Sequence, residues 1–261
     1  MRTPTVRSDS AVPLATSEDV AAAADAAHER RRIGIDTEFM SEGRYRALLC
    51  LVQIAVDDPT GAPAPRIDLI DSFDRIDVTP VAQLLADPSI EVVLHAGRQD
   101  VAILRRAWST EITNVFDTQL SAGFVGASAQ TGYGNLLGSM LGRRVGKTAS
   151  YTRWDARPLS DEQLSYAAED VAHLLELADE VQRRLQETGR LTWAREDRAG
   201  RLAAAAPRPS RDRARRWPTQ AAGTLLAPIQ GARSPAGAAE ARRPVRAGAP
   251  RPRRRSSAAP R

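Results

Sequence analysis

Cysteine, lysine and aromatic side chains are scarce in this chain of 261 residues, and the scarcity of cysteine excludes two kinds of site. A single cysteine, Cys50, can neither close an internal disulfide nor build a cysteine-based zinc site, and its apolar surroundings favour a buried structural role. Lys147 is the one lysine, so arginine supplies nearly all the positive charge. Aromatic residues make up 5% of the chain, but the hydrophobic share of 42% still allows a sizeable core.

Long apolar runs are also missing. No run approaches the roughly 18 to 20 residues that cross a bilayer, so no membrane partner is expected. The polar stretch from Met1 to Pro13 has no apolar core of the kind found in signal peptides. A cytoplasmic protein is therefore the default expectation.

Positive charge is concentrated toward the end of the sequence. From Arg201 onward there are 15 arginines against Asp212 and Glu240, a net charge of +13, whereas the first 200 residues carry −8. Nine prolines and few apolar anchors predict that residues 201–261 form a disordered tail. Such a tail suggests contact with nucleic acid, and a merely solvated tail is an equal alternative.

Hydrophobic periodicity before the tail predicts one α/β domain over residues 17–200, after a disordered N-terminus at residues 1–16. Five strands are expected, at Arg32–Phe39, Leu48–Val56, Ile67–Asp71, Ile90–Leu94 and Val115–Phe116. Helices are expected from a cap at Ser17 to Glu29, around Val81–Leu85, at Asp100–Trp108, around Leu136–Leu141, and as one long helix from Ser160 to near Gly189. This order implies a mixed sheet flanked by helices.

Two carboxylates, Asp36 and Glu38, end the first strand. Residues i and i+2 of a strand share a face, so both side chains project together from a buried strand. Like charges held this close repel, and their burial is costly unless a partner or a metal ion compensates. This stretch alone has two interpretations, a metal site or a strand that simply ends in a polar loop, because the pattern Asp-x-Glu is common.

Three later residues add to this pair. Asp100 lies in the first turn of the helix that follows the fourth strand, at the same edge of the sheet if the first and fourth strands are parallel neighbours. Tyr166 and Asp170 are four apart in the last helix and therefore share a face. Taken singly, Tyr166 could be a core aromatic and Asp170 a surface charge.

Together these segments resemble the tyrosine subclass of the DEDD 3′-5′ exonucleases, and ribonuclease D in particular. The resemblance covers about residues 30–195, and five separated segments agree in order and in rough spacing. These segments are Asp36-Thr37-Glu38-Phe39, Leu94-His95-Ala96-Gly97 with Asp100, Phe116-Asp117-Thr118-Gln119, Trp154 with Arg157-Pro158-Leu159, and Tyr166-Ala167-Ala168-Glu169-Asp170.

The resemblance implies a ribonuclease H-like fold and two divalent metal ions, Mg²⁺ or Mn²⁺. Their ligands would be Asp36, Glu38, Asp100 and Asp170, and four carboxylates do suit hard cations. Tyr166 would orient the attacking water. The expected products are nucleoside 5′-monophosphates, released one at a time from a 3′ end.

Substrate contacts are expected beside the metal ligands and in the basic stretch before the last helix. The candidates are Thr37, Phe39, Met40, His95, Lys147 and Arg153. Phe39 could equally belong to the core, and His95 could equally make a structural hydrogen bond. Structural roles are favoured for Trp154, Arg157 and Asp117, the last as a helix cap.

The leading hypothesis is a metal-dependent 3′-5′ exoribonuclease that acts, as a monomer, on RNA with a free 3′ end such as tRNA precursors. Ribonuclease D proteins usually carry helical HRDC modules, and no such periodicity follows Leu202, which leaves the tRNA preference open. The tail could be a basic arm or a frameshifted remnant. The alternatives are a 3′-5′ DNA exonuclease and a non-catalytic RNA-binding protein on a nuclease fold, and 2′-hydroxyl contacts cannot be located from the sequence.

Overall fold

The computed structural model describes residues 12–58, 61–128, 130–144 and 153–194, all within the first of the chain's two compact units, Met1–Pro209. Lys147 and the predicted tail lie outside the described residues. Within these ranges, no helix is long and apolar enough to cross a bilayer. The elements are α1 (Ser17–Arg30), β1 (Arg32–Met40), β2 (Leu48–Val56), β3 (Arg66–Asp71), α2 (Thr79–Ala86), β4 (Glu91–Leu94), α3 (Arg98–Trp108), β5 (Val115–Asp117), α4 (Thr118–Gly123), α5 (Tyr133–Leu141), α6 (Asp161–Ala172) and α7 (Leu174–Glu187).

The sheet has the order β3-β2-β1-β4-β5, which puts the first strand at its centre. β1 pairs antiparallel with β2 and parallel with β4, while β3 and β5 form the two edges. The predicted mixed five-stranded sheet flanked by helices is therefore confirmed. The parallel pairing of β1 with β4 also confirms the neighbour relation on which the placement of Asp100 depended.

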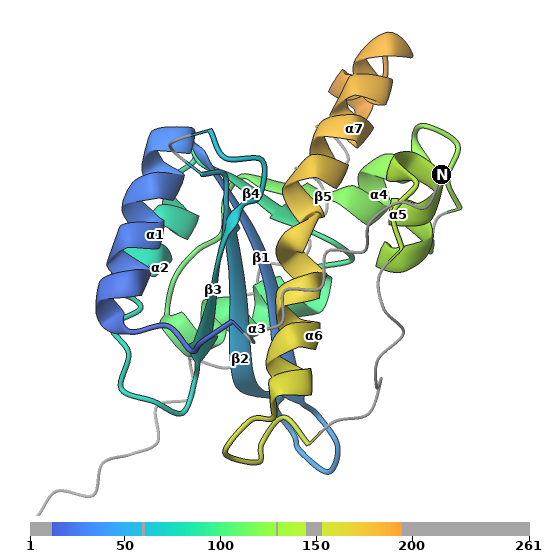
Figure 1. Cartoon of the computed structure of the whole chain (residues 1–261). Coiled ribbons are helices and arrows are strands. Elements are labelled where there is room, and N and C mark those ends of the chain that lie inside the picture. The colour runs from blue at the N-terminus through green and yellow to red at the C-terminus, as the bar shows by residue number, and fades with distance from the viewer. Residues whose placement is uncertain (1–11, 59–60, 129, 145–152, 195–261) are drawn as a thin grey trace, which may run out of the picture. The chain divides into compact units, whose positions relative to one another are not determined.

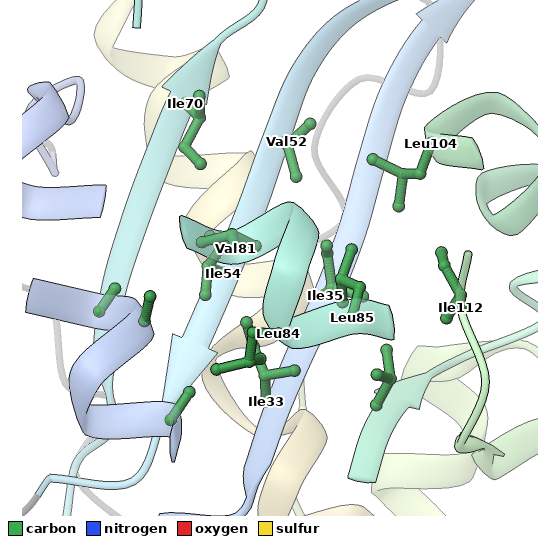
Figure 2. Close-up of a cluster of buried hydrophobic side chains, with 14 of the residues drawn as sticks. Ile33, Ile35, Val52, Ile54, Ile70, Val81, Leu84, Leu85, Leu104 and Ile112 are labelled. Atoms are coloured by element: carbon green, nitrogen blue, oxygen red, sulfur yellow. The ribbon is translucent and has the colours of Figure 1, made fainter. Parts of the chain in front are cut away.

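One face of the sheet packs against α1, α2 and α3 (Figure 1). Ile33 and Ile35 of β1 point into this core and are fully buried, as is Leu85 of α2 (Figure 2). Burial of one such side chain is worth about 1.5 to 3 kcal/mol. Because side chains alternate along a strand, this packing leaves Asp36 and Glu38 on the opposite face of β1.

The opposite face of the sheet is covered by α6 and α7 (Figure 1). α6 lies over β1, β2 and β3, whereas α7 packs on β1 and β4 and on the helices α4 and α5. Gly34 lets α7 approach closely, since a Cβ added there would lie 3.3 Å from Cδ2 of Leu175. The strand that carries the two carboxylates is therefore covered by both α6 and α7.

The N-terminal boundary of the domain differs from the prediction. Leu14 forms a parallel bridge with Leu69, the N–H of Ala15 donates to the Leu69 carbonyl at 2.8 Å, and Ala15 is buried. The cap of α1 is Thr16 and not Ser17, because Thr16 and Asp19 form a reciprocal capping box. The domain therefore includes residues 12–16, and the predicted disorder over residues 1–16 is wrong for these five residues.

The single long helix predicted after Ser160 is wrong, because two helices, α6 and α7, meet at His173. The backbone of His173 has φ −119° and ψ 10°, which ends α6 without a glycine or a proline. The break separates a helix that packs on β1, β2 and β3 from one that also packs on α4 and α5. Tertiary packing, which a local apolar pattern does not record, accounts for the difference.

Arg157 fastens the segment that leads into α6. Its guanidinium donates to the Asp71 carboxylate through Nε at 2.5 Å and Nη2 at 2.6 Å, and to the carbonyls of Cys50 and Trp154. It also lies 4.5 Å from the centroid of the Phe73 ring. Asp71 is buried, so this bidentate pair compensates a charge that would otherwise be costly. The structural role expected for Arg157 is confirmed.

Replacing Arg157 with alanine should lower the free energy of unfolding by about 3 to 5 kcal/mol, because Asp71 is left buried without its partner. Urea denaturation followed by circular dichroism measures this. Arg153→Ala is the matched control, since the Arg153 side chain is 76% exposed and pairs with Asp155 at the surface. Equal stabilities of the two variants would contradict the anchoring role.

Candidate active site

Asp36 and Glu38 lie on the face of β1 that α6 covers. Across the antiparallel pair, Asp36 is opposite Gln53 and Glu38 is opposite Leu51. The register shifts immediately after Glu38, where β2 contains one extra residue, Cys50. Bulges of this kind are frequent beside functional sites, because they re-aim neighbouring side chains.

Tyr166 and Asp170 come from α6. A capping box sets the start of this helix, with Ser160 Oγ accepting from the Gln163 N–H and the Gln163 side chain accepting from the Ser160 N–H. The Tyr166 ring lies 6.2 Å from that of Trp154, which is buried and has the packing role expected for it. The helix spacing therefore brings Tyr166 and Asp170 to one face, above β1.

A pocket of about 270 Å³ brings the two elements together. Four of the five residues predicted to be catalytic line it, namely three carboxylates and Tyr166. No arginine or lysine of the described residues is in the lining. The lining consists of Asp36, Thr37, Glu38, His95, Tyr133, Tyr166, Asp170 and Leu174.

Asp100 is beside this pocket but does not line it. It lies in the first turn of α3, is buried, and accepts a hydrogen bond from the hydroxyl of Thr37, whose side chain is on the strand face opposite Asp36. Its charge still reaches Asp36 and raises the pKa of that carboxyl. Among the described residues, no three acidic, histidine or cysteine side chains already stand in an arrangement that would hold a metal ion.

Burial and mutual repulsion shift the acid groups of the pocket together. Burial, followed by the charges of Asp100, Asp170 and Glu38, raises the pKa of Asp36 well above its usual range. Burial and the charges of Asp170 and Asp100 raise the pKa of Glu38 to about 8, and burial raises that of Asp170 to about 7. Burial raises the pKa of Asp100 as well, although the Thr37 hydroxyl opposes this shift.

This donor set fits a hard divalent cation. Carboxylate oxygens are the ligands that Mg²⁺ and Mn²⁺ prefer, and a cation would relieve both the burial cost and the repulsion that shift these pKa values. Asp36, Glu38 and Asp170 are available in the pocket. Asp100 lies outside the lining, and the Thr37 hydroxyl occupies only one of its two carboxylate oxygens.

Only some of the residues predicted to contact the substrate lie at the pocket. Thr37 and His95 line the pocket. Phe39 packs against the core shared with α1, α2 and α3, and Met40 ends β1 and packs near Trp154, so both have structural roles and their contact with substrate stays a prediction. Arg153 is exposed and paired with Asp155. Lys147 lies outside the described residues.

Two residues of this region were missed by the sequence reasoning. Tyr133, at the start of α5, lines the pocket, and its spacing to the other residues carries no signal. Gln53 is fully buried opposite Asp36, and neither polar atom of its amide has a hydrogen-bond partner within the described structure. A polar residue inside the long apolar run of β2 was the one available signal for Gln53.

Asp117 caps α4, as the sequence predicted. Its carboxylate accepts from the N–H groups of Gln119 and Leu120, and also from those of Ala96 and Gly97 in the turn between β4 and α3. One carboxylate therefore joins the turn between β4 and α3 to the first turn of α4.

Comparison with known proteins decides the family. A family model described as 3′-5′ exonuclease matches residues 12–186, which contain all five strands and every pocket residue. The chain belongs to the 3′-5′ exonuclease family. The exonuclease fold of this family is metal-dependent.

Relatives within this exonuclease family include curated ribonuclease D proteins. Ribonuclease D of Granulibacter bethesdensis is 37% identical over 187 residues, which are 71% of this chain and 46% of that protein. The chain thus spans about half the length of the curated relatives it matches.

Solved exonuclease structures share the fold. Escherichia coli RNase D, described as an exoribonuclease involved in structured RNA processing, matches with a TM-score of 0.66 and 28% identity, over 74% of this chain and 49% of that one. Brucella melitensis NrnC matches with a TM-score of 0.59 and 30% identity, over 67% and 82% of the two chains. Other structures of NrnC contain pGG or Mg²⁺.

The stability of the metal-free domain should fall as the pH rises from about 5 to 8. The pKa of Glu38 rises from 4.5 to about 8 on folding and that of Asp170 from 3.8 to about 7, so the native state holds more protons than the unfolded chain in this window. Melting temperatures in EDTA measure the slope. Mg²⁺ should restore stability, most strongly at pH 8, and Glu38→Gln should flatten the slope. A melting temperature that rises over this window in EDTA would contradict the argument.

Proposed function

We propose that this protein is a metal-dependent 3′-5′ exoribonuclease that removes nucleoside 5′-monophosphates from RNA 3′ ends. The observation that carries the proposal is the pocket that holds Asp36, Glu38, Tyr166 and Asp170 together, with Asp100 beside it. The family match and the ribonuclease D relatives support the same reaction class.

Two divalent ions, Mg²⁺ or Mn²⁺, are the proposed cofactors, with Asp36, Glu38, Asp100 and Asp170 as their ligands. When bound, such ions activate a water and stabilise the leaving 3′ oxygen of an in-line displacement. The protein's own contribution is the array of carboxylates, whose pKa values are raised by burial and, for Asp36 and Glu38, by the neighbouring acidic groups.

Tyr166 acts on the water as a hydrogen-bonding group and not as a base. Burial and the charges of Asp170, Glu38 and Asp36 raise the pKa of its phenol above the usual value of 10.0, so the hydroxyl keeps its proton at neutral pH. Contact with the Trp154 ring holds the phenol in place. Its proposed role is therefore to orient the attacking water.

Thr37 controls the fourth ligand in this proposal. Its hydroxyl donates to the Asp100 carboxylate beside the pocket. The hydrogen bond occupies Oδ1 and leaves the second carboxylate oxygen available to a cation. Asp100 is thus proposed to complete the site when the cation arrives.

RNA with a free 3′ end is the proposed substrate, and maturation of tRNA or another stable RNA is the proposed process. His95 and Thr37, which line the pocket, are proposed to contact the terminal nucleotide, while Arg153 and Lys147 are proposed to meet phosphates further along the strand. The exonuclease domain is proposed to cover residues 12–200. A monomeric state, a cytoplasmic location and a role for the tail in RNA binding stay predictions.

The deciding assay presents a 3′-extended RNA and a DNA of the same sequence to the full chain. With Mg²⁺ we expect stepwise shortening of the RNA, which EDTA or Asp36→Asn abolishes, because the ion-binding charge is lost. Tyr166→Phe should slow the reaction roughly a hundredfold or more, since the group that orients the water is removed. Gel electrophoresis of the end-labelled strands records each step.

Asp25→Asn is the control for this assay, because Asp25 is an exposed carboxylate on α1, across the sheet from the pocket. It should shorten RNA at the wild-type rate. Undiminished activity of Asp36→Asn, or activity in EDTA, would overturn the metal-dependent mechanism. Preferential shortening of the DNA would make the protein a DNA exonuclease, and binding without shortening would make it a non-catalytic RNA-binding protein.

A further inference from the structure

His95 is held rigidly at the wall of the pocket. The two residues that follow it, Ala96 and Gly97, donate their backbone N–H groups to the Asp117 carboxylate at 3.1 and 3.0 Å. Ala96 adopts the left-handed conformation with φ 56°, and a Cβ added at Gly97 would lie 2.6 Å from the Leu94 Cβ. A turn this closely constrained fixes where the imidazole can lie.

The hydrogen bonds of Thr118 determine which nitrogen of His95 carries the proton. The Thr118 hydroxyl lies 3.1 Å from the Leu94 carbonyl, to which it can only donate, and 2.9 Å from Nδ1 of His95. With its own hydrogen committed, the hydroxyl accepts from Nδ1–H. Burial lowers the pKa of His95, so the ring is neutral at pH 7 and Nε2 presents a free lone pair.

That lone pair has no partner in the described structure. Nε2 of His95 and the hydroxyl of Tyr133 are both buried without a hydrogen bond, and the two rings meet edge to face with centroids 5.5 Å apart. The Thr131 backbone acts on the pKa of His95 and the His173 backbone on that of Tyr133, but neither backbone group makes a hydrogen bond to Nε2 or to the Tyr133 hydroxyl. Both residues line the pocket that holds the carboxylates, and their two unsatisfied polar atoms lie beneath its surface.

We infer that Nε2 of His95 and the hydroxyl of Tyr133 recognise a ribose hydroxyl of the 3′-terminal nucleotide. This inference rests on the proposed function and adds to it a source of selectivity. A ribose hydroxyl donates the hydrogen that Nε2 lacks, and Tyr133 can either donate to or accept from the same group. An end without that hydroxyl leaves both buried atoms unsatisfied, which penalises it.

Asp36 and Asp170 make the assignment more specific. Their charges, after burial, contribute to the raised pKa of Tyr133, so its hydroxyl lies within electrostatic reach of the carboxylates and keeps its proton. A ribose bound against Tyr133 and His95 would therefore sit next to the proposed reaction centre. Recognition and cleavage would concern the same nucleotide.

The test uses three RNAs that differ only in the last nucleotide, which is ribo, 2′-deoxy or 3′-deoxy. The rate constant kcat/KM for release of that nucleotide is measured with Mg²⁺. Wild type should release the ribo end roughly tenfold faster than the end that lacks the recognised hydroxyl. The slower of the two deoxy ends identifies which hydroxyl is read.

His95→Ala should slow the ribo end by the same roughly tenfold, leave the slow deoxy end unchanged, and so bring the ratio close to one. His95→Gln keeps an acceptor near Nε2 and should retain most of the ratio, while Tyr133→Phe should lower it by a smaller factor. Each ratio comes from one protein preparation, so partial unfolding of a variant cancels. His28→Ala, on α1, is the matched control and should behave as wild type.

A wild-type ratio near one for both deoxy ends would overturn the inference, as would a His95→Ala variant that keeps the wild-type ratio. In both cases the ribo end is still shortened and the proposed exoribonuclease activity stands. Failure of the wild type to release any of the three terminal nucleotides would instead count against the proposed function itself.

Discussion

Repulsion among carboxylates in a partly buried pocket is the constraint on which this structure depends. Asp36, Glu38 and Asp170 line the same pocket, and the charge of the nearby Asp100 raises the pKa of Asp36. No arginine or lysine side chain of the described residues lines this pocket. Such an arrangement is unfavourable in an isolated protein, and the surrounding fold has to hold it. The central position of β1, the capping box of α6 and the Arg157–Asp71 pair each fix one part of it.

Two faces of one sheet take part in the site. Asp36 and Glu38 point toward α6, whereas Asp100 comes from α3, which packs on the other face. Thr37 connects the two, because the residue between the carboxylates points toward α3 and its hydroxyl reaches Asp100. The same alternation that buries Ile33 and Ile35 thus divides the acidic groups between the faces, and metal binding would have to draw them together.

Sequence reasoning reached most of the fold because its signals were local. The five strands follow from apolar runs, and Asp36, Glu38, Tyr166 and Asp170 follow from their spacing together with the family resemblance. Tyr133, the break at His173 and the bond between Thr37 and Asp100 could not be predicted, since each depends on contacts between distant segments. The cap of α1 was misplaced by one residue because Thr16 and Ser17 are both good caps, and the choice lies in the reciprocal bond with Asp19.

The most direct test of the central claim is the number of protons released when a divalent cation binds. Calorimetric titration with Mn²⁺ at pH 7, in two buffers of different ionisation enthalpy, gives that number without any substrate. Glu38, with a pKa of about 8, and Asp170, with a pKa of about 7, hold protons that a cation must displace, so the account predicts net release. Saturable binding without proton release, or binding that persists unchanged in Asp36→Asn, would contradict it.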